Sequence, residues 1–157
     1  MPISRKDFIA DLRTLLGTPF GHQGRLEDGT LDCGGIVLVA ARKHGFTTLE
    51  ELGYARFPTD GRFEELLGEH TDLVGEYRWP FGFTGDELEP GDLMSFDYGM
   101  NDEGTRHVSF ISGFARHRYK IVEAQPVYGV CEHAIAPPYV TRTTTLKGWS
   151  LKRYFGE

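Results

Sequence analysis

The pattern of apolar residues changes part-way along the chain, and this change limits the possible folds more than any other feature. Before residue 46, two apolar segments have the spacing and the ends of α-helices. After the turn-forming sequence Glu89-Pro90-Gly91-Asp92, short segments of β-branched and aromatic residues follow one another, as in successive strands. We therefore predict an α+β fold, in which N-terminal helices pack on a C-terminal antiparallel sheet.

The two N-terminal helices have recognisable ends. The first is predicted over residues 4–16 and begins at Ser4, whose hydroxyl is a favourable N-cap. The second is predicted over residues 34–43, follows the potential N-cap Asp32 and ends in basic residues, which suit a helix C-terminus. Its apolar run could also form a buried strand, but the two ends favour a helix.

Further elements are predicted from residue 61 onward. A third, more polar helix is expected at residues 61–70, with Thr59 or Asp60 as its N-cap. Strands are then expected at residues 93–98, 107–112, 119–125 and 127–135. The length of 157 residues suits one domain, which we place at residues 1–157.

Composition and charge disfavour several classes of function. The net charge of −6 disfavours a general nucleic-acid binder, which normally presents a basic face. The first residues lack the apolar core of a signal peptide, and no segment is apolar enough to span a bilayer. We therefore expect a protein made in the cytoplasm, with no nucleic-acid partner and no membrane insertion.

The two cysteines, Cys33 and Cys131, lie far apart in dissimilar surroundings. No Cys-x-x-Cys sequence, metal-ligand spacing or glycine-rich phosphate loop occurs, so we expect neither a metal site nor a cofactor. A single disulfide between the two cysteines is one alternative. Two free thiols suit a protein made in the cytoplasm better.

Cys33 is the candidate nucleophile, because it stands at the start of the second predicted helix. The unpaired backbone amides and the dipole at a helix N-terminus favour a thiolate and can stabilise an oxyanion beside it. Gly34 and Gly35 leave space for a substrate backbone. The alternative is a small, inert cysteine that is buried before a core helix.

His107 and Glu123 are the candidate partners of this thiol. His107 begins a predicted strand, from which an imidazole can reach a helix N-terminus and act as a general base. A three-residue hairpin loop at residues 114–116 would place Glu123 directly opposite His107, where its carboxylate could orient the ring. A four-residue loop would point Glu123 away. Gln125, on the same face, is the alternative.

Five motifs occur in an order that resembles a known family. They are Gly17-Thr18-Pro19-Phe20, Asp32-Cys33-Gly34-Gly35, Pro90-Gly91-Asp92-Leu93, His107-Val108 and Val122-Glu123-Ala124. Their order and spacing resemble those of the NlpC family of bacterial and phage cell-wall cysteine peptidases, a circularly rearranged branch of the papain-like fold. The resemblance runs from about residue 4 to residue 135, with no family signal between residues 47 and 83.

The resemblance implies a peptidoglycan endopeptidase with Cys33 as nucleophile, His107 as base and Glu123 as the residue that orients the base. The bonds cut by the family lie in peptidoglycan stem peptides, typically between D-glutamate and a diamino acid. The predicted substrate-binding residues are Asp32, Gly34, His22, Gln23 and Gln125. The sequence departs from the family at three positions: Gly34 replaces a serine, Phe20 replaces an aromatic hydroxyl, and Glu123 stands where His, Asn or Gln is commoner.

The loop at residues 22–25 looks most like the phage-tail branch of this family. That likeness implies a protein made in the bacterial cytoplasm and carried at the virion tail tip, with other tail-tip proteins as partners. The alternative function is a structural tail-tip or tail-assembly protein that keeps the peptidase fold with latent or no activity. An acyltransferase with the same Cys and His is a third alternative, but the chain offers no lipid-facing apolar segment for it.

Overall fold

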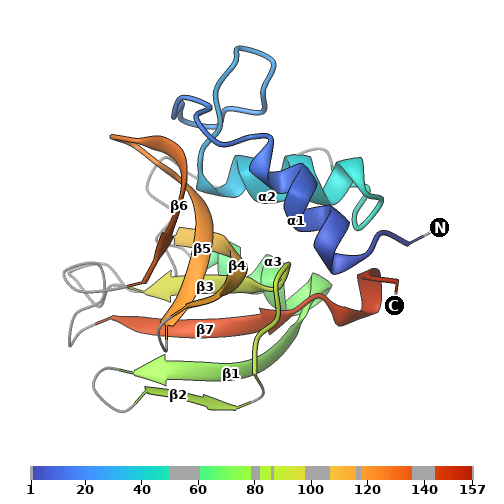
Figure 1. Cartoon of the computed structure of the whole chain (residues 1–157), viewed down its shortest axis with the longest axis vertical. Helices are drawn as coiled ribbons and strands as arrows, with labels where there is room; N and C mark the ends of the chain where they lie inside the picture. The colour runs from blue at the N-terminus through green and yellow to red at the C-terminus, as the bar shows by residue number, and fades with distance from the viewer. Residues whose placement is uncertain are drawn as a thin grey trace.

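The computed structural model describes residues 2–49, 61–78, 82–85, 87–97, 107–115, 118–135 and 144–156. Within these ranges, three α-helices precede a seven-stranded sheet, so the predicted α+β fold is confirmed (Figure 1). The helices are α1 (Arg5–Arg13), α2 (Cys33–Lys43) and α3 (Arg62–His70), and a 3₁₀ helix, η1, covers Lys152–Tyr154. The strands are β1 (Asp72–Arg78), β2 (Gly82–Gly85), β3 (Leu93–Asp97), β4 (His107–Ala115), β5 (Arg118–Gln125), β6 (Gly129–Ala134) and β7 (Thr145–Ser150).

The sheet is antiparallel throughout and has the strand order β2-β1-β7-β3-β4-β5-β6. Figure 1 shows that it bends strongly, so that β5 and β6 rise beside α1 and α2 while β1, β2 and β7 lie below. The second helix contacts β4 and β5. It therefore packs on the two strands that carry His107 and Glu123.

The predicted first helix is confirmed at its start and corrected at its end. The Ser4 hydroxyl accepts a hydrogen bond from Asp7 N, as expected for an N-cap. However, α1 ends at Arg13, three residues earlier than predicted, and a turn follows. Gly17 stands in this turn with φ +89°, a conformation that costs glycine little and other residues more.

The second helix occupies the predicted segment and begins at Cys33. The third has a different N-cap from the predicted one. The residue that precedes α3 is Gly61, whose φ of +76° is left-handed and which offers no side-chain cap. The predicted caps, Thr59 and Asp60, lie outside the described residues.

All four predicted strands are present, and the structure adds three more. The last predicted strand is shorter than expected, since Val127 and Tyr128 are turn residues, 82% and 74% exposed, and β6 begins at Gly129. The predicted end of the strand at Tyr98 lies outside the described residues. β1, β2 and β7 were not predicted, although β7 lies near the middle of the sheet, between β1 and β3.

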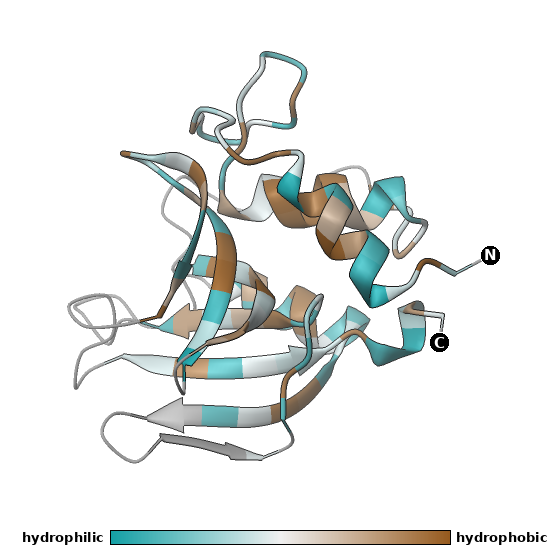
Figure 2. Cartoon of the chain, viewed as in Figure 1, coloured by the Kyte–Doolittle hydropathy of each residue, from teal (hydrophilic) through white to brown (hydrophobic). Residues whose placement is uncertain are grey.

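Two apolar clusters fill the two faces of the sheet. The first joins the helices to one face, and its almost fully buried members include Phe8, Leu12, Ile36, Leu38, Phe110 and Val122. The second covers the other face and is formed by Leu88, Met94, Phe96, Ile111, Ile121 and Leu146. Figure 2 shows hydrophobic residues concentrated along α1 and α2, where the two helices lie together. Because side chains alternate along a strand, neighbouring residues of β4 and β5 enter different clusters.

Asp92, from the motif at residues 90–93, ties together three distant parts of the chain. It is 2% exposed, and its Oδ1 accepts hydrogen bonds from Arg5 Nη1 at 2.9 Å and from Leu151 N at 3.0 Å. Its Oδ2 accepts from Glu89 N at 2.9 Å. The motif therefore anchors the start of α1 and the end of β7 to the turn before β3.

At Val130, the outer side of β6 is paired with the segment that follows α1. Gly17 N donates to Val130 O, and Val130 N donates to Thr18 O, both at 2.9 Å. The backbone groups of Val130 that point away from β5 are thus satisfied. This pairing also fixes the start of the loop that leads to Cys33.

Candidate active site

Cys33 is the first residue of α2 and is half-buried against the first apolar cluster. The predicted cap is confirmed, since Asp32 Oδ1 accepts a hydrogen bond from Gly35 N at 2.7 Å. Ile36 N donates to Asp32 O at 3.1 Å and begins the helical ladder. The amides of Gly35 and Ile36 are therefore occupied, and those of Cys33 and Gly34 are the candidates for stabilising an oxyanion.

Asp32 also holds the loop at residues 22–25 against the start of α2. Its Oδ2 accepts from Gln23 N at 2.7 Å, and its Oδ1 lies 3.1 Å from Arg25 Nη1. The carboxylate is buried, with its residue 2% exposed, and Arg25 donates a further bond to Gly24 O at 2.9 Å. The Asp32 carboxylate therefore binds groups of the loop and of α2. Its predicted contact with substrate stays a prediction.

Two glycines leave no space for a side chain, Gly35 where the helix meets the loop and Gly24 within the loop itself. A Cβ on Gly35 would lie 2.2 Å from Gly24 O, and one on Gly24 would lie 2.4 Å from Thr30 Oγ1. In the same loop, Gln23 has a positive φ of +55°. His22 and Gln23 are exposed, whereas Gly34 is buried. Two of the predicted substrate-binding side chains are thus accessible beside the first turn of α2.

The β4–β5 hairpin differs from the predicted one. A three-residue loop at 114–116 was expected, but β4 continues to Ala115, which pairs with Arg118. This hairpin shifts the pairing by three residues relative to the prediction. A bulge between Ile111 and Gly113 then reverses the shift by one residue. The net shift is even, so each side chain keeps the face that was predicted for it.

Glu123 therefore lies diagonally across from His107, not directly opposite it. Phe110 pairs with Val122, and counting on by one residue brings Glu123 opposite Ser109. Diagonal neighbours on one face remain within reach of long side chains. The prediction of direct opposition is wrong, but the two side chains still meet.

The Glu123 carboxylate is fully buried between two imidazole rings. Its Oε1 lies 3.7 Å from His107 Nε2, and its Oε2 lies 3.1 Å from His133 Nε2. Glu123 is 0% exposed, and the His107 ring packs against Phe96 with 5.2 Å between the ring centroids. A buried carboxylate beside an imidazole can orient the ring and stabilise its protonated form.

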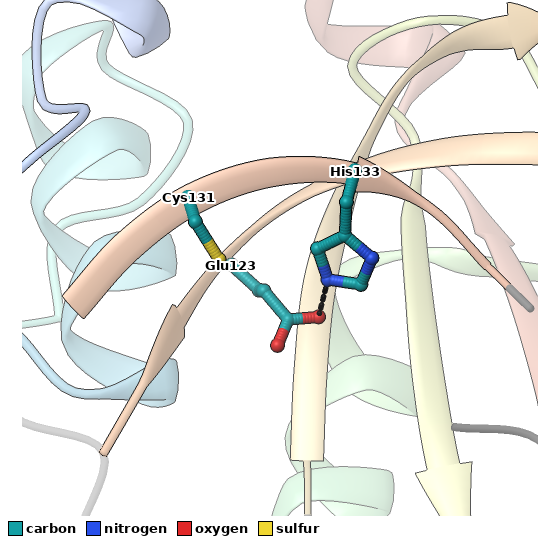
Figure 3. A group of neighbouring side chains, drawn as sticks. All are labelled: Glu123, Cys131 and His133. Carbon is teal, nitrogen blue, oxygen red and sulfur yellow. Dashed lines mark ion pairs between the residues drawn. The ribbon is translucent and has the colours of Figure 1, made fainter. Parts of the chain in front are cut away.

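The charge of Glu123 affects the titration of two residues on β6. Its hydrogen bond raises the pKa of His133, although burial of the ring opposes this rise. Burial raises the pKa of the Cys131 thiol, and the charge of Glu123 raises it further. Figure 3 shows Glu123, Cys131 and His133 together, with the contact between Glu123 and His133 marked. Cys131 is therefore a neutral thiol around neutral pH.

Among the residues that it describes, the structure brings His107 and Glu123 together but shows no polar contact between Cys33 and either of them. His107 and Glu123 share one face of the sheet, and Gln125 Nε2 lies 3.5 Å from His133 Nε2. Within the described parts of the chain, Cys33 makes no hydrogen bond with His107 or Glu123. Cys33 packs against the first apolar cluster, whereas His107 contacts Phe96 of the second cluster, so the pairing of Cys33 with His107 stays a prediction.

His133 was missed by the sequence analysis, and Cys131 was not recognised as part of a polar cluster. Both belong to β6, whose register follows from the pairing of Gln125 with Gly129. The short turn between these two residues was a usable signal, because it places Cys131 opposite Glu123.

Comparisons with known proteins give a match in structure but none in sequence. No protein-family model and no curated protein matches the sequence. Among solved structures, the NlpC/p60 domain of the peptidoglycan hydrolase SagA matches with a TM-score of 0.58 and 16% identity, over 95% of this chain and 100% of that domain. The chain has the NlpC/p60 fold. At this identity the likeness concerns the fold and not the activity.

None of the described helices is long and apolar enough to cross a bilayer. Both cysteines are free, so the alternative of a disulfide between them is wrong.

Proposed function

We propose that this protein is a cysteine peptidase of the NlpC type that cleaves amide bonds in peptidoglycan stem peptides. The observation that carries the proposal is the fully buried Glu123 carboxylate beside His107, in an NlpC/p60 fold with Cys33 at the start of α2. The SagA domain supports peptidoglycan as the substrate class, since it comes from a peptidoglycan hydrolase.

In the proposed reaction, Cys33 Sγ attacks the carbonyl carbon of the amide as a thiolate. The carbonyl oxygen becomes an oxyanion, for which the backbone amides of Cys33 and Gly34 are the nearest donors in the first helical turn. Protonated His107 gives its proton to the leaving nitrogen, the C–N bond breaks, and a thioester remains. Water deprotonated by His107 then attacks the thioester, which releases the acid and restores the thiol.

Glu123 gives this site a full negative charge where a neutral residue is commoner. In a buried position, such a charge stabilises the imidazolium form of His107 more strongly than an amide would. His133, which contacts the other carboxylate oxygen at 3.1 Å, holds Glu123 in place. The proposed role of Glu123 is thus to orient His107 and to stabilise its protonated state.

The proposal is tested by incubating the purified chain with peptidoglycan sacculi and measuring released muropeptides by mass spectrometry. Cys33→Ala and His107→Ala are expected to lower the rate by more than about 1,000-fold. His70→Ala, at the end of α3, is the matched histidine control and should keep the rate. Equal release by wild type and Cys33→Ala would show that Cys33 is not the nucleophile.

We also propose that the protein works at a phage tail tip, because the loop at residues 22–25 resembles that of the phage-tail branch. A structural tail protein with latent activity is the second candidate. Tails assembled with Cys33→Ala protein separate the two functions: unchanged infection favours the structural role, whereas lost infection with intact tails favours wall cleavage.

A further inference from the structure

A cluster of three metal-ligating side chains lies on β5 and β6, beside the proposed catalytic histidine. We call Glu123, Cys131 and His133 the β5–β6 cluster (Figure 3). One potential ligand atom from each lies within 4.8 Å of the other two. Glu123 pairs directly with Cys131 across the two strands, and His133 follows two residues along β6, on the same face. The sheet itself therefore holds these side chains together.

We propose that the β5–β6 cluster binds one divalent transition-metal ion, with Zn²⁺ as the best match. Zinc combines thiolate, imidazole and carboxylate ligands in one tetrahedral site, whereas Mg²⁺ and Ca²⁺ prefer oxygen ligands only. Three protein ligands leave a fourth position open to water or to another side chain.

The orientation of the His133 ring supports this proposal independently of the clustering. Its Nδ1 lies 3.0 Å from Ala134 O, and a carbonyl oxygen only accepts, so Nδ1 carries a hydrogen. Without a metal ion, Nε2 also carries a hydrogen and donates it to Glu123 Oε2, 3.1 Å away, and a bound ion would take the place of that hydrogen. Metal-binding histidines characteristically donate their second N–H to a backbone carbonyl in this way.

A proton or a metal ion can join His133 Nε2 to the Glu123 carboxylate. His133 Nε2 and the Glu123 carboxylate repel each other unless a proton or a metal ion bridges them. Neighbouring ligand atoms of a tetrahedral zinc ion, with bonds of about 2.0–2.3 Å, lie roughly 3.3–3.6 Å apart. The separation of 3.1 Å between His133 Nε2 and Glu123 Oε2 is close to that spacing, and the potential ligand atoms of the cluster all lie within 4.8 Å of one another.

The cluster is also accessible and electrically suited to a cation. Cys131 and His133 are half-buried and belong to the last strand in the sheet order, whereas Glu123 is fully buried. A divalent ion would displace the thiol proton of Cys131 and would offset the charges of both the thiolate and the carboxylate. The buried Glu123 carboxylate supplies negative charge, and the half-buried Cys131 and His133 are the ligands that an ion can reach from solvent.

Metal binding would also inhibit the peptidase, a consequence that rests on the proposed function. An ion bound to Glu123 draws the carboxylate away from its role beside His107, 3.7 Å distant. The imidazolium form of His107 would then lose its stabilising charge. The β5–β6 cluster thus couples metal availability to hydrolysis.

Binding is tested on the full chain with the metal alone. Isothermal titration with Zn²⁺ should give one equivalent, and Co²⁺ should give the absorption of a sulfur–cobalt bond. Cys131→Ser and His133→Ala are expected to weaken Zn²⁺ binding by about tenfold or more and, for Cys131→Ser, to abolish the sulfur–cobalt band. Cys33→Ser, which removes the other thiol, should bind like wild type. Circular dichroism checks that each variant is folded.

Three results would overturn the proposal: no saturable Zn²⁺ binding by folded wild type, equal binding by folded Cys131→Ser and His133→Ala, or loss of binding in Cys33→Ser. Hydrolysis is measured separately, as the ratio of rates with and without Zn²⁺ for each variant. A chain that binds Zn²⁺ but never releases muropeptides refutes the proposed function and leaves the metal site standing. Zn²⁺ binding without inhibition of an active wild type refutes only the coupling.

Discussion

Asp32 makes the sharpest prediction, because one buried carboxylate fixes both the helix that begins at Cys33 and the loop before it. Replacement by alanine removes the bond from Gly35 N and the bond from Gln23 N, both of 2.7 Å, and the 3.1 Å contact with Arg25. Loss of an N-cap costs about 1 kcal/mol. Arg25 keeps its bond to Gly24 O but loses the charge of Asp32, which raises the total to about 3–5 kcal/mol.

The free energy of unfolding of Asp32→Ala is measured by urea denaturation, with Glu27→Ala as the matched control. Glu27 is an exposed acidic residue of the same loop, so its replacement should change stability by less than about 0.5 kcal/mol. Asp32→Asn keeps a good cap but loses the charge that faces Arg25. Its loss of stability should therefore lie between those of Glu27→Ala and Asp32→Ala. A cost below about 1 kcal/mol for Asp32→Ala would refute the view that this carboxylate holds the loop.

Other predictions concern the orienting charge, a surface ion pair and a close backbone approach. Glu123→Gln should lower kcat by about 10- to 100-fold in the muropeptide assay, with little change in KM, since a neutral amide stabilises the imidazolium less. Burial alone would raise the pKa of Asp11, but hydrogen bonds from Lys43 and His44 outweigh it and lower that pKa. The stability that ionised Asp11 contributes is therefore complete above the pKa that Asp11 has in the unfolded chain. It is lost as the pH falls through the lower pKa that Asp11 has in the folded chain. Asp11→Asn should flatten that acid-side decline in unfolding experiments. Gly35→Ala should destabilise the chain by about 1–3 kcal/mol in urea, because its Cβ would lie 2.2 Å from a backbone oxygen.

The parts of the fold that local chemistry determines could be predicted from the sequence. Ser4 and Asp32 cap their helices as expected, because a cap needs only a side-chain oxygen and an amide two or three residues later. The strands β3 to β6 follow from runs of β-branched and aromatic residues. Such signals are complete within a few residues.

The parts that depend on distant partners could not be predicted. β7 was missed, although its Trp149 is 4% exposed and donates a hydrogen bond from Nε1 to Ser95 Oγ at 2.9 Å. Nothing near residue 149 in the sequence indicates that β1 and β3 lie on either side of this strand. β1 contains a central glycine and three charged residues, so its sequence lacks the apolar run typical of a strand.

The candidate site was predicted in part, and for a reason that lies in strand geometry. The register of the β4–β5 hairpin was wrong by two residues, and an even error leaves every side chain on its predicted face. His107 and Glu123 therefore still meet. His133 was missed because its relation to Glu123 depends on the register of the β5–β6 pair, which the short turn at residues 126–128 sets.

The pairing of residues 17 and 18 with β6 has a consequence for the behaviour of the protein in concentrated solution. An uncovered strand at the end of a sheet presents amides and carbonyls with which another chain can form a ladder, the first step of aggregation. Here Gly17 and Thr18 already occupy the outward groups of Val130 at 2.9 Å. The segment after α1 thus closes the Val130 end of β6 to strand addition by a second molecule.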